Sequence, residues 1–206
     1  MEILNIDNIT MQFGGLTAVK NFELRLQSGE LVGLIGPNGA GKTTIFNMIT
    51  GIYTPTINKI YFKEMDITGM KPDKIAKLGI ARTFQNVRLM ENLTVIDNVM
   101  IGFHLRLHSN LASAIFKFPG YVQEEENIYQ KSIELLEKVD LERCKMENAG
   151  SLPYGQQRKL EIVRALATEP KLLLLDEPAA GMNPQETKEL MCFIQKIRDD
   201  FDLTIL

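Results

Sequence analysis

A glycine-rich segment that ends in a lysine and two hydroxyl residues carries the clearest chemistry in this sequence. It reads Gly36-Pro-Asn-Gly-Ala-Gly-Lys-Thr-Thr44 and fits the pattern G-x-x-x-x-G-K-[ST], which is typical of phosphate loops. Its glycines allow a tight turn with backbone N–H groups directed at phosphate oxygens. Lys42 would add a point charge for the outer phosphates, and Thr43 would offer a hydroxyl to Mg²⁺. The segment therefore predicts a nucleoside triphosphate site.

Two adjacent carboxylates form the second chemical feature. They follow four leucines in Lys171-Leu-Leu-Leu-Leu-Asp-Glu-Pro178. A buried strand that delivers Asp176 and Glu177 to its carboxyl end would place them where sites lie in open α/β sheets. Asp176 would then hold Mg²⁺ through water, and Glu177 would orient or deprotonate the attacking water. A solvated turn is the alternative interpretation, which the phosphate loop in the same chain disfavours.

The phosphate loop needs a strand before it and a helix after it. Residues 31–35 are apolar and predict a buried strand that runs into the loop. Gly41 should open a helix that ends at Gly51, and its N-terminus would face the anion. The apolar residues of this helix should face the core, and they are Ile45, Phe46, Met48 and Ile49.

Periodicity and turn residues predict the remaining elements. Strands are expected at Ile3–Ile9, Phe22–Leu26, Ile57–Phe62, Ile80–Gln85 and Leu203–Leu206, and a turn at Asp66–Asp73. Helices are expected from Thr94 through Leu107, where Thr94 and Asp97 give a capping signal, and then over Glu124–Val139 and Tyr154–Leu166. Residues 109–120 lack a clear period and predict a mobile connection.

Composition narrows the classes of function. The formal net charge of −3 gives no basic field for nucleic acid, so we expect no such partner. No apolar run approaches the roughly 20 residues of a membrane span, so we expect no direct membrane insertion. Cys144 and Cys192 lie far apart and predict a reducing compartment without a disulfide. His104 and His108 favour a surface helix pair over a metal site.

Phe13 stands beside two glycines, where an exposed aromatic could stack on a base; a packing role in the core is the alternative.

Together, these features resemble the ATP-binding subunit of an ATP-binding-cassette (ABC) transporter over essentially the whole chain. The matching parts are Gly36–Thr44 as the phosphate loop, Gln85 as the glutamine loop, Leu172–Glu177 as the magnesium and carboxylate strand, Leu152–Gln157 as the signature and Phe13 as the adenine-stacking aromatic.

The resemblance implies ATP and Mg²⁺ as cofactors. The implied nucleotide contacts are Phe13, Gly36, Asn38, Gly39, Ala40, Gly41, Lys42, Thr43, Thr44, Gly155 and Gln156. The implied Mg²⁺ ligands are Thr43, Gln85 and Asp176, and the implied catalytic residues are Glu177 and Gln85.

The implied fold is α/β, with a P-loop ATPase core, a mostly parallel sheet, an N-terminal antiparallel β subdomain and an inserted α-helical subdomain. Residues 1–206 would form one domain. Residues 1–86 and 152–206 would be its nucleotide-binding core with the β subdomain, and residues 87–151 its helical subdomain.

Three segments look most like the ATPase subunits of branched-chain amino acid importers: Ala81–Leu89, Tyr154–Arg158 and Asp176–Pro184. This implies a dimer with a second copy or a sister subunit, integral-membrane permease subunits, and a peripheral place on the cytoplasmic face of the plasma membrane. The alternatives are import of another polar small solute, or a soluble cassette ATPase of DNA repair or translation. A nucleotide kinase or small GTPase lacks support because no Asn-Lys-x-Asp occurs.

The sequence departs from the family in three places. Pro153 and Tyr154 replace the signature serine and its first glycine, so backbone N–H groups would carry that contact. Asn183 stands where many members have aspartate. The family's histidine for the γ-phosphate would follow 203–206 but is missing, so we expect a truncated chain with slow hydrolysis and exposed apolar surface on its terminal strand.

Overall fold

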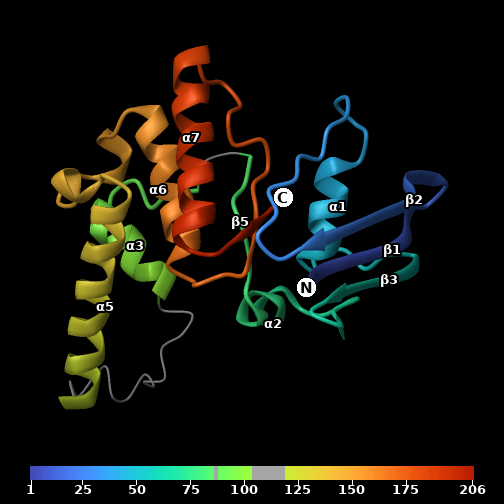
Figure 1. Cartoon of the computed structure of the whole chain (residues 1–206), viewed down its shortest axis with the longest axis horizontal. Coiled ribbons are helices and arrows are strands. Elements are labelled where there is room, and N and C mark those ends of the chain that lie inside the picture. The colour runs from blue at the N-terminus through green and yellow to red at the C-terminus, as the bar shows by residue number, and fades with distance from the viewer. Residues whose placement is uncertain (86–87, 104–118) are drawn as a thin grey trace. The chain divides into compact units, whose positions relative to one another are not determined.

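The computed structural model describes residues 1–85, 88–103 and 119–206. They form two compact units (Figure 1). The first unit contains Met1–Arg82, Pro170–Glu177 and Ile194–Leu206, and the second contains Thr83–Glu169 and Pro178–Phe193. His104, His108 and most of the expected mobile connection lie outside the described residues. The predicted division of the chain into core and helical subdomain stays a prediction.

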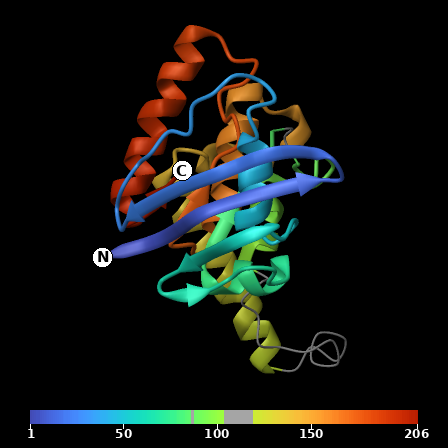
Figure 2. The ribbon, with the colours of Figure 1, turned by 90° about the vertical axis from the view of Figure 1, so that its right-hand side faces the viewer.

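A four-stranded antiparallel sheet opens the first unit. Its order is β2-β1-β3-β4, with β1 at Glu2–Phe13, β2 at Leu16–Gln27, β3 at Ile57–Phe62 and β4 at Met65–Asp66. The first two strands are longer than predicted, because they pair up to a tight turn in which Gly14 has a φ of 58°. Figure 2 shows β1, β2 and β3 crossing the face of α1. The predicted antiparallel N-terminal sheet is confirmed.

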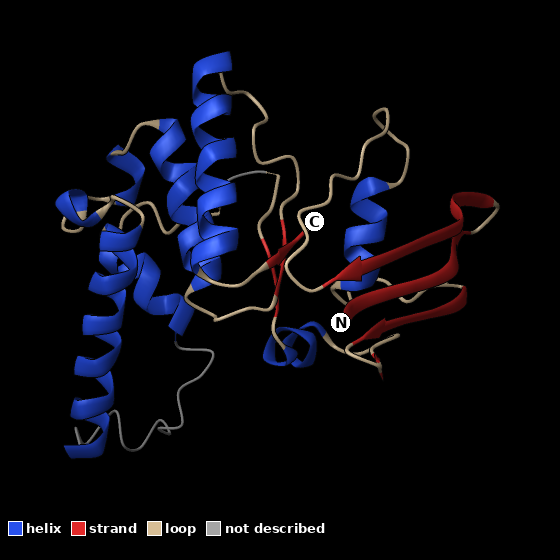
Figure 3. Cartoon of the chain, viewed as in Figure 1, coloured by secondary structure: helices blue, strands red, loops and turns tan. Residues whose placement is uncertain are grey.

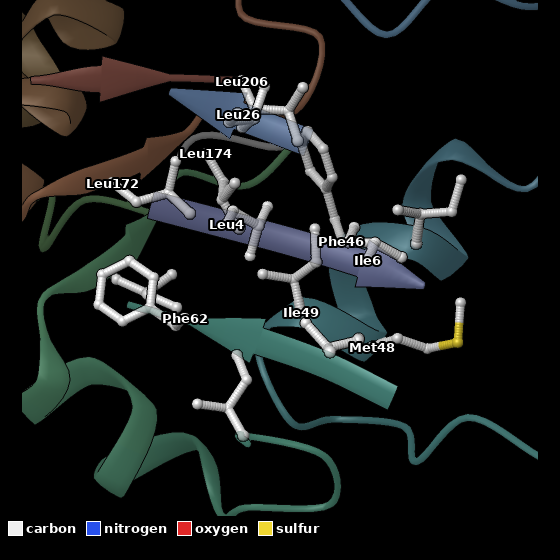
Figure 4. Close-up of a cluster of buried hydrophobic side chains, with 14 of the residues drawn as sticks. Leu4, Ile6, Leu26, Phe46, Met48, Ile49, Phe62, Leu172, Leu174 and Leu206 are labelled. Atoms are coloured by element: carbon white, nitrogen blue, oxygen red, sulfur yellow. The ribbon is translucent and has the colours of Figure 1, made fainter. Parts of the chain in front are cut away.

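Helix α1 (Lys42–Ile49) supplies one side of the main core. Its four predicted core residues are all buried, in a cluster with side chains of β1, β3 and β6 (Figure 4). The partners that Figure 4 labels include Leu4, Ile6, Phe62, Leu172 and Leu174. Burial of one such side chain contributes about 1.5–3 kcal/mol, so this packing fixes the helix against the antiparallel sheet.

A three-stranded parallel sheet completes the first unit. Its order is β5-β6-β7, with β5 at Ile80–Arg82, β6 at Leu172–Leu174 and β7 at Thr204–Ile205. Leu172–Leu175 are buried, as predicted. The register pairs Arg82 with Leu174, so the residues after both strands emerge at one edge. A short helix, α2 (Pro72–Leu78), precedes β5 and was not expected.

The expected buried strand at 31–35 is wrong. Leu31 makes only an isolated parallel bridge to Ile205, and Ile35 is 93% exposed. The reason is that β7 contains only two residues. Its backbone hydrogen bonds reach Val32, and the residues after Val32 lie beyond the end of β7. The expected apolar exposure of the terminal strand is also wrong, because residues 203–206 are buried between β6 and Leu31.

Helices dominate the second unit (Figure 3). They are α3 (Val95–Phe103), α5 (Pro119–Lys138), α6 (Tyr154–Leu166) and the start of α7 (Pro184–Asp200), with short 3₁₀ turns at Glu142–Cys144 and Ala149–Ser151. The predicted capping signal is confirmed, because Thr94 and Asp97 exchange two side-chain-to-backbone hydrogen bonds of 3.2 Å. Within residues 1–85, 88–103 and 119–206, none of the helices combines the length and apolar character needed to cross a bilayer.

Candidate functional site

The phosphate loop meets α1 at Gly41, which has a φ of 88°. A Cβ there would lie 2.7 Å from the Ala18 carbonyl oxygen and 2.8 Å from Val19 Cγ2. Both the backbone conformation and the close approach therefore require glycine. No side chain caps the helix, so its first N–H groups and its partial positive charge are available to an anion.

Lys42 folds back over the loop at the first position of α1. Its Nζ donates to the carbonyl oxygens of Gly36 at 2.7 Å and Pro37 at 3.1 Å. These bonds hold the ammonium beside the loop's backbone. Thr43 is exposed and Thr44 is half-buried on the same first turn. A cation, hydroxyls and helix N–H groups form a donor set that suits a polyphosphate.

Phe13 lies at the end of β1 and makes an edge-to-face contact with Tyr53, with ring centroids 5.1 Å apart. Both rings are partly exposed, Phe13 by 41%. The Tyr53 N–H donates to the Asn47 carbonyl oxygen at 3.1 Å, so the chain leaving α1 brings the second ring to the first. Such a pair offers flat surface on which a base can stack. Sequence reasoning missed Tyr53, because no spacing links it to Phe13.

Asp176 is buried just beyond β6 and paired with a cation. Its Oδ2 accepts a hydrogen bond of 2.9 Å from Arg82 Nη2, and both side chains are 6% exposed. Arg82 Nη1 donates to Asn47 Oδ1 of α1 at 2.7 Å. Arg82 therefore connects β5, the carboxylate and the phosphate-loop helix. The role of Arg82 was not predicted, because the strand was expected to continue to Gln85, whereas β5 ends at Arg82.

Glu177 has a φ of 48°, a left-handed conformation that is uncommon for a residue with a side chain. Backbone of this kind gathers at functional sites, where the surroundings hold it in place. The half-buried carboxylate directly follows Asp176 and stands before Pro178. Its predicted part in hydrolysis stays a prediction.

The first unit thus brings together the phosphate loop, the aromatic pair and both carboxylates. Hydroxyl and carboxylate oxygens, as in Thr43 and Asp176, are ligands that suit Mg²⁺. The other predicted site residues belong to the second unit: Gln85 is exposed, and Gly155 and Gln156 occupy the first turn of α6. Their predicted roles stay predictions.

Comparisons with known proteins agree with this chemistry. The sequence model of the ABC transporter family matches residues 19–180. The branched-chain amino acid transport ATP-binding protein BraF of Pseudomonas aeruginosa is 44% identical over 99% of this chain and 80% of its own length. Its counterpart LivG of Escherichia coli is 43% identical with the same coverage.

Solved structures of ATP-binding cassettes share the fold. One cassette of an ABC transporter, solved in its ADP conformation, has a TM-score of 0.86 and 32% identity, with 100% of this chain and 80% of that chain covered. A dimeric cassette in a post-hydrolysis state with ADP and phosphate has a TM-score of 0.77 and 25% identity, with 98% and 86% covered. The predicted α/β P-loop ATPase fold is confirmed.

Proposed function

Because the chain belongs to the ABC transporter family as an ATP-binding subunit, we propose that it hydrolyses MgATP to drive the import of branched-chain amino acids. The observation that carries the proposal is the phosphate loop at the N-terminus of α1, with Lys42 held beside it. The identity of 43–44% to BraF and LivG over nearly the whole chain supports the solute class.

Each part of the first unit has a task in this function. Lys42 and the first N–H groups of α1 bind the phosphates, and Phe13 with Tyr53 stacks on adenine. The remaining loop residues that contact nucleotide are Gly36, Asn38, Gly39, Ala40, Gly41, Thr43 and Thr44.

A second set of side chains would bind the metal and orient the attacking water. Thr43, Asp176 and Gln85 would hold Mg²⁺, which when bound neutralises charge on the phosphate oxygens. Arg82 keeps the Asp176 carboxylate in place. Glu177, helped by Gln85, orients the attacking water and takes its proton.

The family's ATP-binding subunits work as dimers with membrane permeases, and we propose the same assembly here, with a second copy or a sister subunit. Gly155 and Gln156 would then contact the partner's nucleotide from the first turn of α6. Pro153 and Tyr154 leave this turn intact, so backbone N–H groups replace the signature hydroxyl.

The permease contact has a candidate surface in the second unit. Met90, Leu93 and Met146 are 52%, 40% and 67% exposed. Backbone hydrogen bonds join their segments, from Ala149 N–H to the Leu93 oxygen and from Val95 N–H to the Glu147 oxygen, both at 2.9 Å. Exposed apolar side chains on adjoining segments suit a protein contact. We place the chain at the cytoplasmic face of the plasma membrane, bound to the permease.

Affinity purification from detergent-solubilised membranes tests the assembly. We expect the tagged chain to recover integral-membrane permease subunits, and a Met90→Glu/Leu93→Glu variant to recover far less. A Leu16→Glu variant is the matched control, because Leu16 is also an exposed apolar residue but belongs to the first unit. Recovery of no permease by the unaltered chain would contradict the proposal. Uptake of labelled leucine, compared with that of a labelled polar solute, tests the solute class.

A further inference from the structure

The hydroxyl of Tyr154 links two segments of the second unit that are distant in sequence. Tyr154 is the first residue of α6, at a position where the signature of the resembling family has glycine. Its Oη donates to the Ala180 carbonyl oxygen at 3.1 Å and accepts from Arg158 Nε at 3.1 Å. A phenol has one hydrogen to donate and can also accept, so both bonds form together.

Arg158 belongs to a buried ion pair with Glu161 on the next turn of α6. The two side chains are 4% and 2% exposed, and Arg158 Nη1 lies 3.1 Å from Glu161 Oε2. A buried pair is stable only when the remaining donors and acceptors also have partners. These partners come from the backbone around Gln85.

The backbone contacts of this pair lie on both sides of Gln85. Arg158 donates to the Phe84 carbonyl oxygen at 3.0 Å and to the Gln85 carbonyl oxygen. Glu161 Oε1 accepts from the Phe84 N–H at 3.4 Å and from the Arg88 N–H at 3.3 Å. The pair therefore holds the segment that carries Gln85 by four backbone groups.

We propose that Tyr154 is a positioning residue that couples the Gln85 segment to residues 178–183 through Arg158. The guanidinium is a planar, rigid fork, so a displacement of the carbonyl groups of 84–85 reorients the Nε–H that holds Tyr154. The phenol passes this change to the Ala180 carbonyl. The replacement of the signature glycine by tyrosine thereby creates a link that glycine cannot make.

The consequence for transport rests on the proposed function. In that function Gln85 helps to hold Mg²⁺ and the attacking water, and the permease surface begins at Met90, five residues further along the chain. A permease contact that shifts residues 84–85 and 88 would then be passed through Arg158 and Tyr154 to residues 178–183, which directly follow Glu177. The hydrogen bonds that form the link require neither ATP nor the permease.

Hydrogen–deuterium exchange of the whole chain, without nucleotide or permease, tests the link. We expect Tyr154→Phe, which removes only the hydroxyl, to speed exchange of amides in 178–183 about threefold to tenfold, the effect of one lost hydrogen bond. Tyr129→Phe on α5 is the matched control and should leave 178–183 unchanged. Amides of α5 should exchange at the same rate in Tyr154→Phe as in the unaltered chain, which distinguishes local loosening of 178–183 from global unfolding.

A double-mutant cycle separates coupling from a merely structural role. Arg158→Lys should also speed exchange in 178–183, but it should add nothing there once Tyr154→Phe is present. If Arg158→Lys unfolds the chain, Glu161→Gln takes its place in the cycle. Unchanged exchange of 178–183 in Tyr154→Phe, or fully additive effects in the double variant, would overturn the proposal. Either result leaves nucleotide binding and permease copurification unaffected, so the two proposals fail independently.

Discussion

Lys42 is the residue on which phosphate binding depends most. Its ammonium lies against the loop carbonyls of Gly36 and Pro37, and on binding it would make more than one charge-assisted hydrogen bond, each worth about 1.5–3 kcal/mol. We expect Lys42→Ala to raise the Kd for MgATP at least about tenfold to a hundredfold. Calorimetric titration measures this. Lys59→Ala, which removes an exposed ion pair with Asp66, is the control, and unchanged affinity in Lys42→Ala would remove the central premise.

Arg82 neutralises a buried carboxylate, so its loss should cost stability. Arg82→Gln leaves the buried Asp176 carboxylate without its cationic partner, a change that typically destabilises by about 3–5 kcal/mol. Urea unfolding monitored by circular dichroism gives the free energy. The control is Arg25→Gln, because Arg25 and Glu23 form an exposed pair whose loss should cost under about 1 kcal/mol. Equal losses in the two variants would show that the Asp176 contact does not stabilise the fold.

The site residues that could be predicted from the sequence are those that stand in short, recognisable patterns. Lys42, Thr43 and the two carboxylates stand in short patterns whose chemistry is readable without a structure. Arg82 and Tyr53 could not be found in that way. Arg82 meets Asp176 across 94 positions, and Tyr53 meets Phe13 only because the chain leaving α1 passes the end of β1.

The elements that could be predicted are those with a strong apolar pattern. Helix α1 and strand β6 follow from the side chains they bury, and β3 was predicted at its observed bounds. The apolar run at 31–35 was misread because a strand also needs a partner, and β7 provides one only near Leu31. Helix α2 was missed because seven residues give too few turns for periodicity, and Pro72, which opens the helix, also suits a turn.

Helices α3 and α6 pack closely against each other at Gly102. At Gly102 a Cβ would lie 2.4 Å from the Arg164 carbonyl oxygen and 2.7 Å from the Ala167 Cβ. We expect Gly102→Ala to destabilise the chain by about 1–3 kcal/mol through overpacking. The matched control is Gly120→Ala at the start of α5, where the Cβ meets open space and the change should stay within about 0.5 kcal/mol. The temperature of thermal unfolding should fall in Gly102→Ala and stay nearly constant in Gly120→Ala, and a Gly102→Ala chain as stable as the original would mean that the helices separate at little cost.

The points at which the chain passes between the two units determine where the predicted catalytic residues lie. The chain passes from the first unit to the second after Arg82 and again after Glu177. Gln85 and Glu177, the two predicted catalytic residues, therefore lie within three residues of a crossing. No local pattern predicts this, because it depends on which strands pair in the parallel sheet.

In the proposed assembly, two subunits stay closed around ATP until it is hydrolysed. Glu177→Gln keeps the shape of the side chain but removes the charge that accepts a proton from water, so binding should remain while turnover falls by about 10²–10⁴-fold. ATP that is bound but not hydrolysed should then hold the closed dimer, which light scattering after size-exclusion chromatography detects as a doubled mass with ATP but not with ADP. Glu134→Gln, an exposed change on α5, controls for the lost charge and should neither slow turnover nor accumulate dimer. Turnover at the original rate in Glu177→Gln would assign the proton to another group, whereas slow turnover without a dimer would separate catalysis from closure.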